Sequence, residues 1–195
     1  MLEKRFEMVK EHHKKTFEDA AINGKMDPQL VSLCRFIAST KQFFTSSSCS
    51  GRIVLLKVNA EESKQESAFH RKWHSTVSAD EVWNALEEKT KDELWLKQEP
   101  LILHIGAESI EGAKKILEIM RKCGIKRGGI MVAKKGKFLL EIVGTQRMSL
   151  PVKKDDKILI SRGHLEFVVG KANRKLEKNY GTLGKFEEAC RKKLS

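Results

Sequence analysis

The sequence predicts an α+β fold, a single domain over residues 1–195 with a mixed sheet flanked by helices. Two observations lead to this class. Apolar residues recur at helical spacing near both ends of the chain, and short apolar runs of strand length lie between them without strict alternation of helix and strand. The chain contains no strand followed by Gly-x-Gly-x-x-Gly, so a Rossmann-type domain is not expected. Two strand–helix–strand passages would fit an internal duplication, although no residue-level repeat is visible.

The first elements form an N-terminal helical pair. Residues 2–22 carry apolar side chains at helical spacing and end at Asn23-Gly24, which is a helix stop. Asp27-Pro28 then supplies an N-cap and a first-turn proline for a second helix. Residues 43–45 form a plausible short strand, and Ser50-Gly51 is a candidate turn of a hairpin that returns as residues 53–58.

The middle of the chain begins with a polar stretch, residues 59–72, which predicts a surface loop. Ser78 and Glu81 have the spacing of a capping box, and the helix they open is expected to run toward Leu94 or Leu96. A strand is predicted at residues 101–105.

The last part of the sequence predicts two helices and a hairpin. Residues 109–123 form an amphipathic helix, and strands 129–133 and 138–143 flank a basic turn. Short extended pieces are predicted at residues 150–152 and 157–160. Residues 163–192 form a long final helix, with Tyr180-Gly181 as a candidate break.

The net charge of +12 is unevenly distributed. Between Lys114 and Lys137 there are nine basic residues and one acid, whereas residues 80–99 are mainly acidic. This asymmetry favours a basic face that binds a polyanion such as RNA. The alternative is the solvated, lysine-rich surface of a thermally robust protein.

The cysteines and the chain ends indicate the compartment. Cys34, Cys49, Cys123 and Cys190 lie far apart without metal-ligand spacing, so we expect reduced thiols and no metal site. No run of about 18 apolar residues predicts a membrane span, and the N-terminus lacks the apolar core of a signal peptide. A cytoplasmic location is therefore expected.

The most informative motif is the run Ser46-Ser47-Ser48-Cys49-Ser50, which we call the hydroxyl loop, followed by Gly51 and Arg52. Its hydroxyls, main-chain N–H groups and guanidinium suit an anion or a polar heterocycle, whereas the simpler interpretation is a serine-rich turn before a strand. Three further motifs accompany it: Lys72-Trp73-His74, Glu99 to His104, and Ala172-Asn173-Arg174. In this order, over nearly the whole chain, the set resembles the third enzyme family of wybutosine synthesis. These enzymes are tRNA methyltransferases that act on the modified guanosine beside the anticodon of tRNA(Phe).

The resemblance implies transfer of a methyl group from S-adenosylmethionine to a ring nitrogen, N(4), of the tricyclic base in tRNA(Phe). Arg52 would face the cofactor carboxylate or an RNA phosphate, and Trp73 would stack on adenine or the modified base unless it is a core residue. Cofactor binding is assigned to Ser46, Ser47, Ser48, Cys49, Gly51, Arg52 and Trp73.

Proton transfer and RNA contacts complete the expected site. His74 and His104 are the candidate catalytic residues, because imidazole titrates near neutral pH, although a strand histidine such as His104 can also be a core residue. RNA binding is assigned to Lys126, Arg127, Lys134, Lys135, Lys137, Asn173 and Arg174. Two other functions fit parts of the sequence: a noncatalytic basic RNA-binding module, and a thiol enzyme built on Cys49.

Overall fold

The computed structural model describes residues 2–58, 68–134 and 136–194, apart from the side chains of residues 2–4. Contacts divide the chain into two compact units. The first contains residues 1–50, 101–145 and 179–195, and the second contains residues 51–100 and 146–178. The α+β class is confirmed, whereas one domain over residues 1–195 stays a prediction. Instead of one mixed sheet there are two sheets, and every pairing between the described strands is antiparallel.

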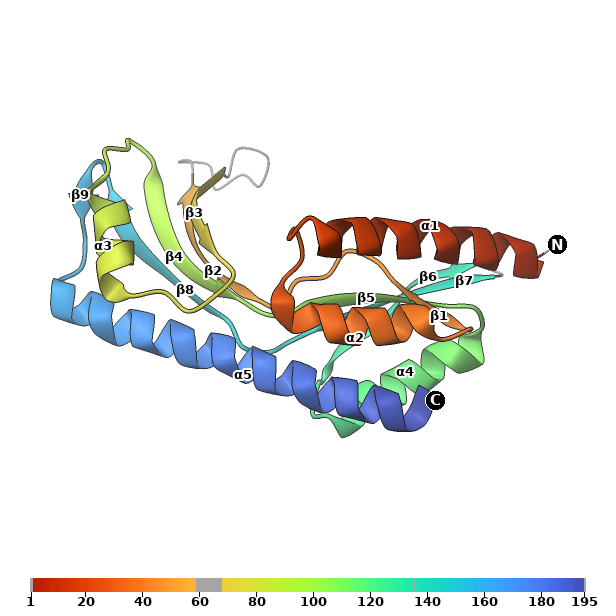
Figure 1. Ribbon diagram of the computed structural model, residues 1–195. Helices are drawn as coiled ribbons and strands as arrows, with labels where there is room; N and C mark the ends of the chain where they lie inside the picture. Colours follow the sequence, from red (N-terminus) through yellow and green to blue (C-terminus); the bar gives the residue numbers. More distant parts are fainter. Residues whose placement is uncertain (1, 59–67, 135, 195) are drawn as a thin grey trace. The chain divides into compact units, whose positions relative to one another are not determined.

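The first unit is built on a four-stranded sheet in the order β1-β5-β7-β6 (Figure 1). Its strands are β1 (Phe43–Thr45), β5 (Ile102–Ala107), β6 (Arg127–Lys134) and β7 (Lys137–Val143). Its helices are α1 (Leu2–Ile22), α2 (Pro28–Ser39), α4 (Ile110–Lys122) and the last part of α5 (Arg162–Leu194).

Strand β1 places two phenylalanines on opposite faces of this sheet, because side chains alternate along a strand. Phe43 belongs to the core formed with α2 and α4. The Phe44 ring lies 5.8 Å from the Phe6 ring of α1 and covers Gly106, where an added Cβ would collide with it. Strand β1 therefore sets the position of α1 over the sheet.

The second unit is built on a five-stranded sheet in the order β3-β2-β4-β8-β9. Its elements are β2 (Arg52–Val58), β3 (Ala68–Trp73), α3 (Ala79–Glu87), β4 (Glu93–Glu99), β8 (Met148–Lys154), β9 (Lys157–Ile158) and the first part of α5. The predicted capping box of α3 is confirmed, with Ser78 and Glu81 bonded reciprocally. Buried Lys153 donates to the carbonyls of Leu86 and Glu88, so its ammonium occupies the C-terminal end of α3.

Four predictions about individual helices and strands are wrong. Strand β1 pairs with β5 and not with β2, so no hairpin turns at residues 50–51. Helix α3 ends at Glu87 because Glu88 is extended, and the alternating burial of residues 93–99 belongs to strand β4.

The remaining two errors concern the polar stretch and the final helix. Strand β3 begins at Ala68, inside the stretch assigned to a loop, of which residues 59–67 lie outside the described residues. Helix α5 continues through Tyr180-Gly181, since buried Leu176, Leu183 and Phe186 keep the helical spacing. Among the described residues, no helix has the length and apolar character needed to cross a membrane.

Candidate functional site

The hydroxyl loop is held against strand β5 by its backbone. Ser46 N–H donates to the His104 carbonyl at 2.9 Å, and Cys49 and Ile102 exchange two hydrogen bonds of 2.8 Å. The loop thus continues the antiparallel pairing of β1 with β5, with Ser47 and Ser48 between the fixed points. This serine run has a defined conformation, which a binding loop requires.

A second attachment comes from Asp27, the residue before α2. Ser50 is fully buried, and both its N–H (2.7 Å) and its Oγ (2.9 Å) donate to Asp27 Oδ2. Asp27 stands at the N-cap position of α2 as predicted, but its side chain makes no capping bond. The carboxylate instead fixes the end of the hydroxyl loop.

Tyr180 of α5 adjoins this attachment within the first unit. Burial raises the pKa of Tyr180, and the Asp27 charge raises it further, whereas a hydrogen bond with the Ser50 side chain lowers it. At neutral pH the phenol is therefore uncharged. Asp27, Ser50 and Tyr180 form a polar cluster at the base of the loop.

His104 supports the middle of the loop from β5. Its Nδ1 lies 2.6 Å from the Ser47 carbonyl and 3.3 Å from Ser47 Oγ, and its Nε2 lies 3.3 Å from Glu141 Oε2. A carbonyl oxygen only accepts, so Nδ1 carries a hydrogen in this arrangement. The His104 backbone N–H donates to Ser48 Oγ at 3.3 Å. Because both ring nitrogens have protein partners, this geometry is that of a residue that positions the loop.

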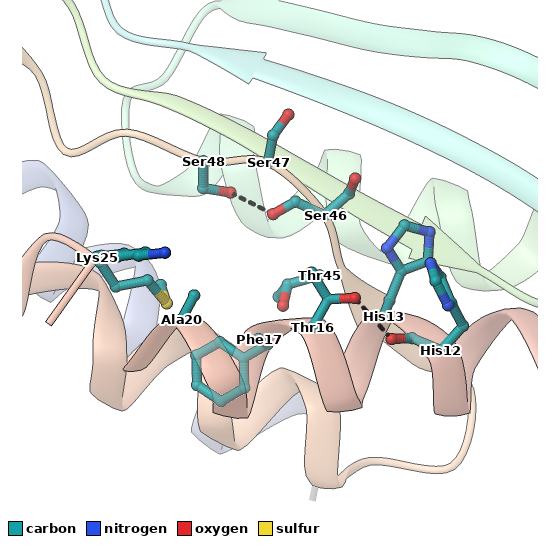
Figure 2. A pocket seen from close by; sticks show the side chains of 11 residues that line it. His12, His13, Thr16, Phe17, Ala20, Lys25, Thr45, Ser46, Ser47 and Ser48 are labelled. Atoms are coloured by element: carbon teal, nitrogen blue, oxygen red, sulfur yellow. Dashed lines mark hydrogen bonds between the residues drawn. The ribbon is translucent and has the colours of Figure 1, made fainter. Parts of the chain in front are cut away.

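Thr45 and the first three serines of the loop form one side of a cavity of about 390 Å³ (Figure 2). Helix α1 and the segment after it form the other side. The lining residues are His12, His13, Thr16, Phe17, Ala20, Lys25, Met26, Thr45, Ser46, Ser47 and Ser48. Figure 2 shows the two imidazoles at one end, Lys25 at the other, and Phe17 and Ala20 between them. The cavity therefore combines hydroxyls, a cation, imidazoles and an apolar wall.

Arg52, at the start of β2 in the second unit, is held by two neighbours. Its Nε donates to Glu99 Oε2 on the paired strand β4, and its guanidinium carbon lies 4.7 Å from the centre of the Phe69 ring. This ion pair fixes the direction of the guanidinium. Gly51 before it has a φ of 100°, a conformation that favours glycine.

The other motif residues of the second unit lie on β3 and α5. Trp73 is half-buried at the end of β3, opposite Ile53, and His74 follows it directly. The Asn173 side chain accepts from Val77 N–H at 3.1 Å and donates to Val77 O at 2.8 Å. Its amide thus anchors the segment before α3, whereas Arg174 beside it is exposed.

The predicted hairpin of β6 and β7 is confirmed. We call Lys126, Arg127, Lys134 and Lys137 the basic hairpin; Lys135, assigned to the same role, lies outside the described residues. Lys134 and Lys137 are paired at the tip, and Lys126 and Arg127 lie at the other end of β6. The two ends are about 23 Å apart at the usual rise along a strand.

The family profile described as Methyltransferase TYW3 matches residues 3–192. The chain belongs to this family. It is 31% identical over 192 residues to a protein of Thermococcus sibiricus named tRNA(Phe) 7-((3-amino-3-carboxypropyl)-4-demethylwyosine(37)-N(4))-methyltransferase, with 98% of both chains covered. It is 31% identical over 179 residues to the tRNA wybutosine-synthesizing protein 3 homolog of Xenopus laevis, covering 90% of this chain and 71% of the relative. Among solved structures, the PH1069 protein from Pyrococcus horikoshii matches with a TM-score of 0.90 and 30% identity, over 96% of this chain and 97% of that chain.

Membership of the TYW3 methyltransferase family confirms the resemblance drawn from the motifs, and it supports an enzyme over a noncatalytic RNA-binding module. The residues that the sequence interpretation missed are His12, His13 and Lys25 of the cavity. A signal for His13 was present, since it shares the apolar face of α1 with Phe17 and Ala20. No local pattern indicated that this face would meet the hydroxyl loop.

Proposed function

We propose that this chain transfers a methyl group from S-adenosylmethionine to N(4) of the tricyclic wybutosine intermediate in tRNA(Phe). The nitrogen lone pair attacks the methyl carbon, the carbon–sulfur bond breaks, and its electron pair stays on sulfur to give S-adenosylhomocysteine. The nitrogen also loses a proton, which needs an acceptor. Family membership supports this reaction, as does the name of the Thermococcus sibiricus relative.

The observation that carries the proposal within the structure is the fixed hydroxyl loop beside a cavity. About 390 Å³ is within the usual size range of small-molecule sites. Ser46, Ser47 and Ser48 would bind polar groups of the cofactor or of the base, and Lys25 supplies a positive charge for a carboxylate or a phosphate. In-line displacement chiefly requires alignment of nitrogen, methyl and sulfur, which a rigid loop favours.

For RNA, the basic hairpin is the contact surface that we assign in the first unit. The Lys137 charge lowers the pKa of His13, so the tip of the hairpin lies near the imidazole end of the cavity. Phosphates bound there would hold a nucleotide beside the cavity. Arg174 is a further exposed cation, whereas RNA contact by Asn173 and Lys135 stays a prediction.

Roles for the remaining motif residues also stay predictions. Arg52, with Glu99 fixing its Nε, would bind the cofactor carboxylate or an RNA phosphate, and Trp73 would stack on a base. His74 is a candidate proton acceptor. Cys49 and Gly51 would contribute to cofactor binding. A tRNA substrate favours a cytoplasmic location.

The deciding experiment incubates the purified chain with labelled S-adenosylmethionine and tRNA(Phe) that carries the unmethylated tricyclic base. Nucleoside mass spectrometry should find one added methyl group on that base. The control is tRNA(Phe) with unmodified guanosine at the same position, which should gain no label. Binding of tRNA with neither S-adenosylmethionine binding nor methyl transfer would favour the RNA-binding module.

A further inference from the structure

His13 stands at the imidazole end of the cavity in a position that the sequence did not reveal. Its ring is stacked on Phe44, with ring centres 4.7 Å apart and planes inclined by 5°. Phe44 is itself buried and packs over Gly106 of β5. The imidazole therefore has a fixed face, while its half-buried side chain still lines the cavity.

The surroundings of His13 favour the uncharged ring. Burial lowers its pKa below the ordinary value of 6.5, and the positive charge of Lys137 on β7 and neighbouring His12 lower it further. The ring stacked on His13, Phe44 of β1, carries no charge, and neither does Gly106 of β5, which lies beneath Phe44. A neutral imidazole has one ring nitrogen able to take a proton.

We propose that His13 accepts the proton that leaves the base nitrogen during methyl transfer. This inference rests on the proposed function. The electron pair of the N–H bond stays on the base, and the proton bonds to the unprotonated ring nitrogen of His13. The imidazolium that forms then releases the proton to solvent, which returns the enzyme to its starting state.

Two other histidines of the first unit fit this task less well. His104 has both ring nitrogens occupied by Ser47 and Glu141. His12 is exposed. Among the ring contacts of the described residues, its ring contacts only that of His13, edge-on, with the ring centres 5.6 Å apart. His13 alone of these three combines a cavity position, a packed face and an environment that keeps it neutral.

The test is a single-turnover measurement of methyl transfer against pH, at saturating S-adenosylmethionine and tRNA. In the unaltered protein the rate should rise with pH below about 6.5 and then level off. His13→Gln keeps a polar side chain of similar size without the proton-accepting nitrogen. It should lower the plateau by about 10²-fold or more and remove the rising limb. His164→Gln, an exposed histidine at the start of α5, is the matched control and should keep both.

A second variant tests the same inference without removing the ring. Lys137→Gln removes the nearby positive charge, so the rising limb should move to higher pH while the imidazole stays in place. Normal S-adenosylmethionine binding by His13→Gln would show that the cavity is intact.

Two results would overturn the inference while leaving the proposed function standing. One is a His13→Gln protein whose plateau stays within about threefold of the unaltered rate and keeps the rising limb. The other is loss of that limb in His12→Gln, or in the His74→Gln variant of the acceptor that the sequence indicates, and not in His13→Gln. Absence of methyl transfer by the unaltered protein would instead contradict the proposed function itself.

Discussion

Asp27 should stabilise the protein through Ser50 and not as a helix cap. Replacing Asp27 with Ala leaves the N–H and the Oγ of a fully buried serine without their common acceptor. An unpaired buried donor costs about 1–3 kcal/mol. The Ser50 hydroxyl keeps its hydrogen bond with Tyr180, so the full cost applies to the N–H and only a smaller cost to the Oγ. The free energy of unfolding should fall by about 2–3 kcal/mol.

Two further substitutions separate the hydrogen bonds from the charge and from capping. Both Ser50 donors bond to the same oxygen, Oδ2, so the amide oxygen of Asp27→Asn can accept both. Neutral bonds are about half as strong, and the loss should be about 1 kcal/mol. Asp27→Ser supplies a good helix cap but is too short to reach Ser50, so it should resemble the alanine variant.

The measurement is urea unfolding followed by circular dichroism, with the midpoint compared at unchanged slope. Ser50→Ala combined with Asp27→Ala gives a double-mutant cycle, in which a coupling of about 1 kcal/mol or more is expected. A loss below about 0.5 kcal/mol for Asp27→Ala, as for an ordinary surface change, would refute this reasoning. Recovery of stability by Asp27→Ser would show that capping, and not the contact with Ser50, is what matters.

Three other outcomes follow from the same structure. Reversing charges in the basic hairpin should weaken tRNA binding and reduce the slope of log affinity against log salt by about 0.7–0.9 per lost phosphate contact. An unchanged slope would show that these side chains are solvated and make no phosphate contact. Arg52→Lys should impair methyl transfer because the guanidinium fork is lost, and Arg52→Ala should nearly abolish it in a folded protein. Cys49→Ser should keep most of the activity. An inactive Cys49→Ser protein beside a nearly normal Arg52→Lys protein would indicate a thiol mechanism. The folded-state pKa of His13 is lowered, so the unfolded chain binds the proton more readily, and stability should fall as pH drops below about 6.5 through the folded pKa. Urea midpoints across this range should vary less in His13→Gln than in the unaltered protein, and equal pH dependence in both would exclude this contribution.

The elements that could be predicted are those whose signals are local. Helix α1 was predicted with its observed bounds, and the α3 capping box lies within four residues. The pairing of β1 could not be predicted in this way, because its partner Ala107 is far along the chain from Phe43. Strand β4 had a local signal, the alternation of Leu94 and Leu96, but a helical period extended from Ser78 obscured it.

The candidate site shows the same difference between local signals and contacts made by distant residues. The hydroxyl loop was found because its composition is unusual by itself, and Arg52 because it follows directly. The groups that hold the loop, Asp27 and His104, come from distant positions that only the sheet and the start of α2 bring together. Asp27 was even assigned a local role as a cap, since a carboxylate before a proline at a helix start usually has that role.

Strand β1 explains why His13 and the hydroxyl loop meet. Phe44 carries the stacking surface for the His13 ring, and the loop begins two residues later at Ser46. The pairing of Phe44 with Gly106 and of Thr45 with Ile105 fixes both the aromatic support and the start of the loop on one strand of the sheet. Three residues of backbone, 44–46, therefore connect the ring that supports the imidazole to the first serine of the loop, although α1 and β1 are separate in the sequence. A reaction that must align a nucleophile, a methyl group and a proton acceptor benefits from such a short rigid connection.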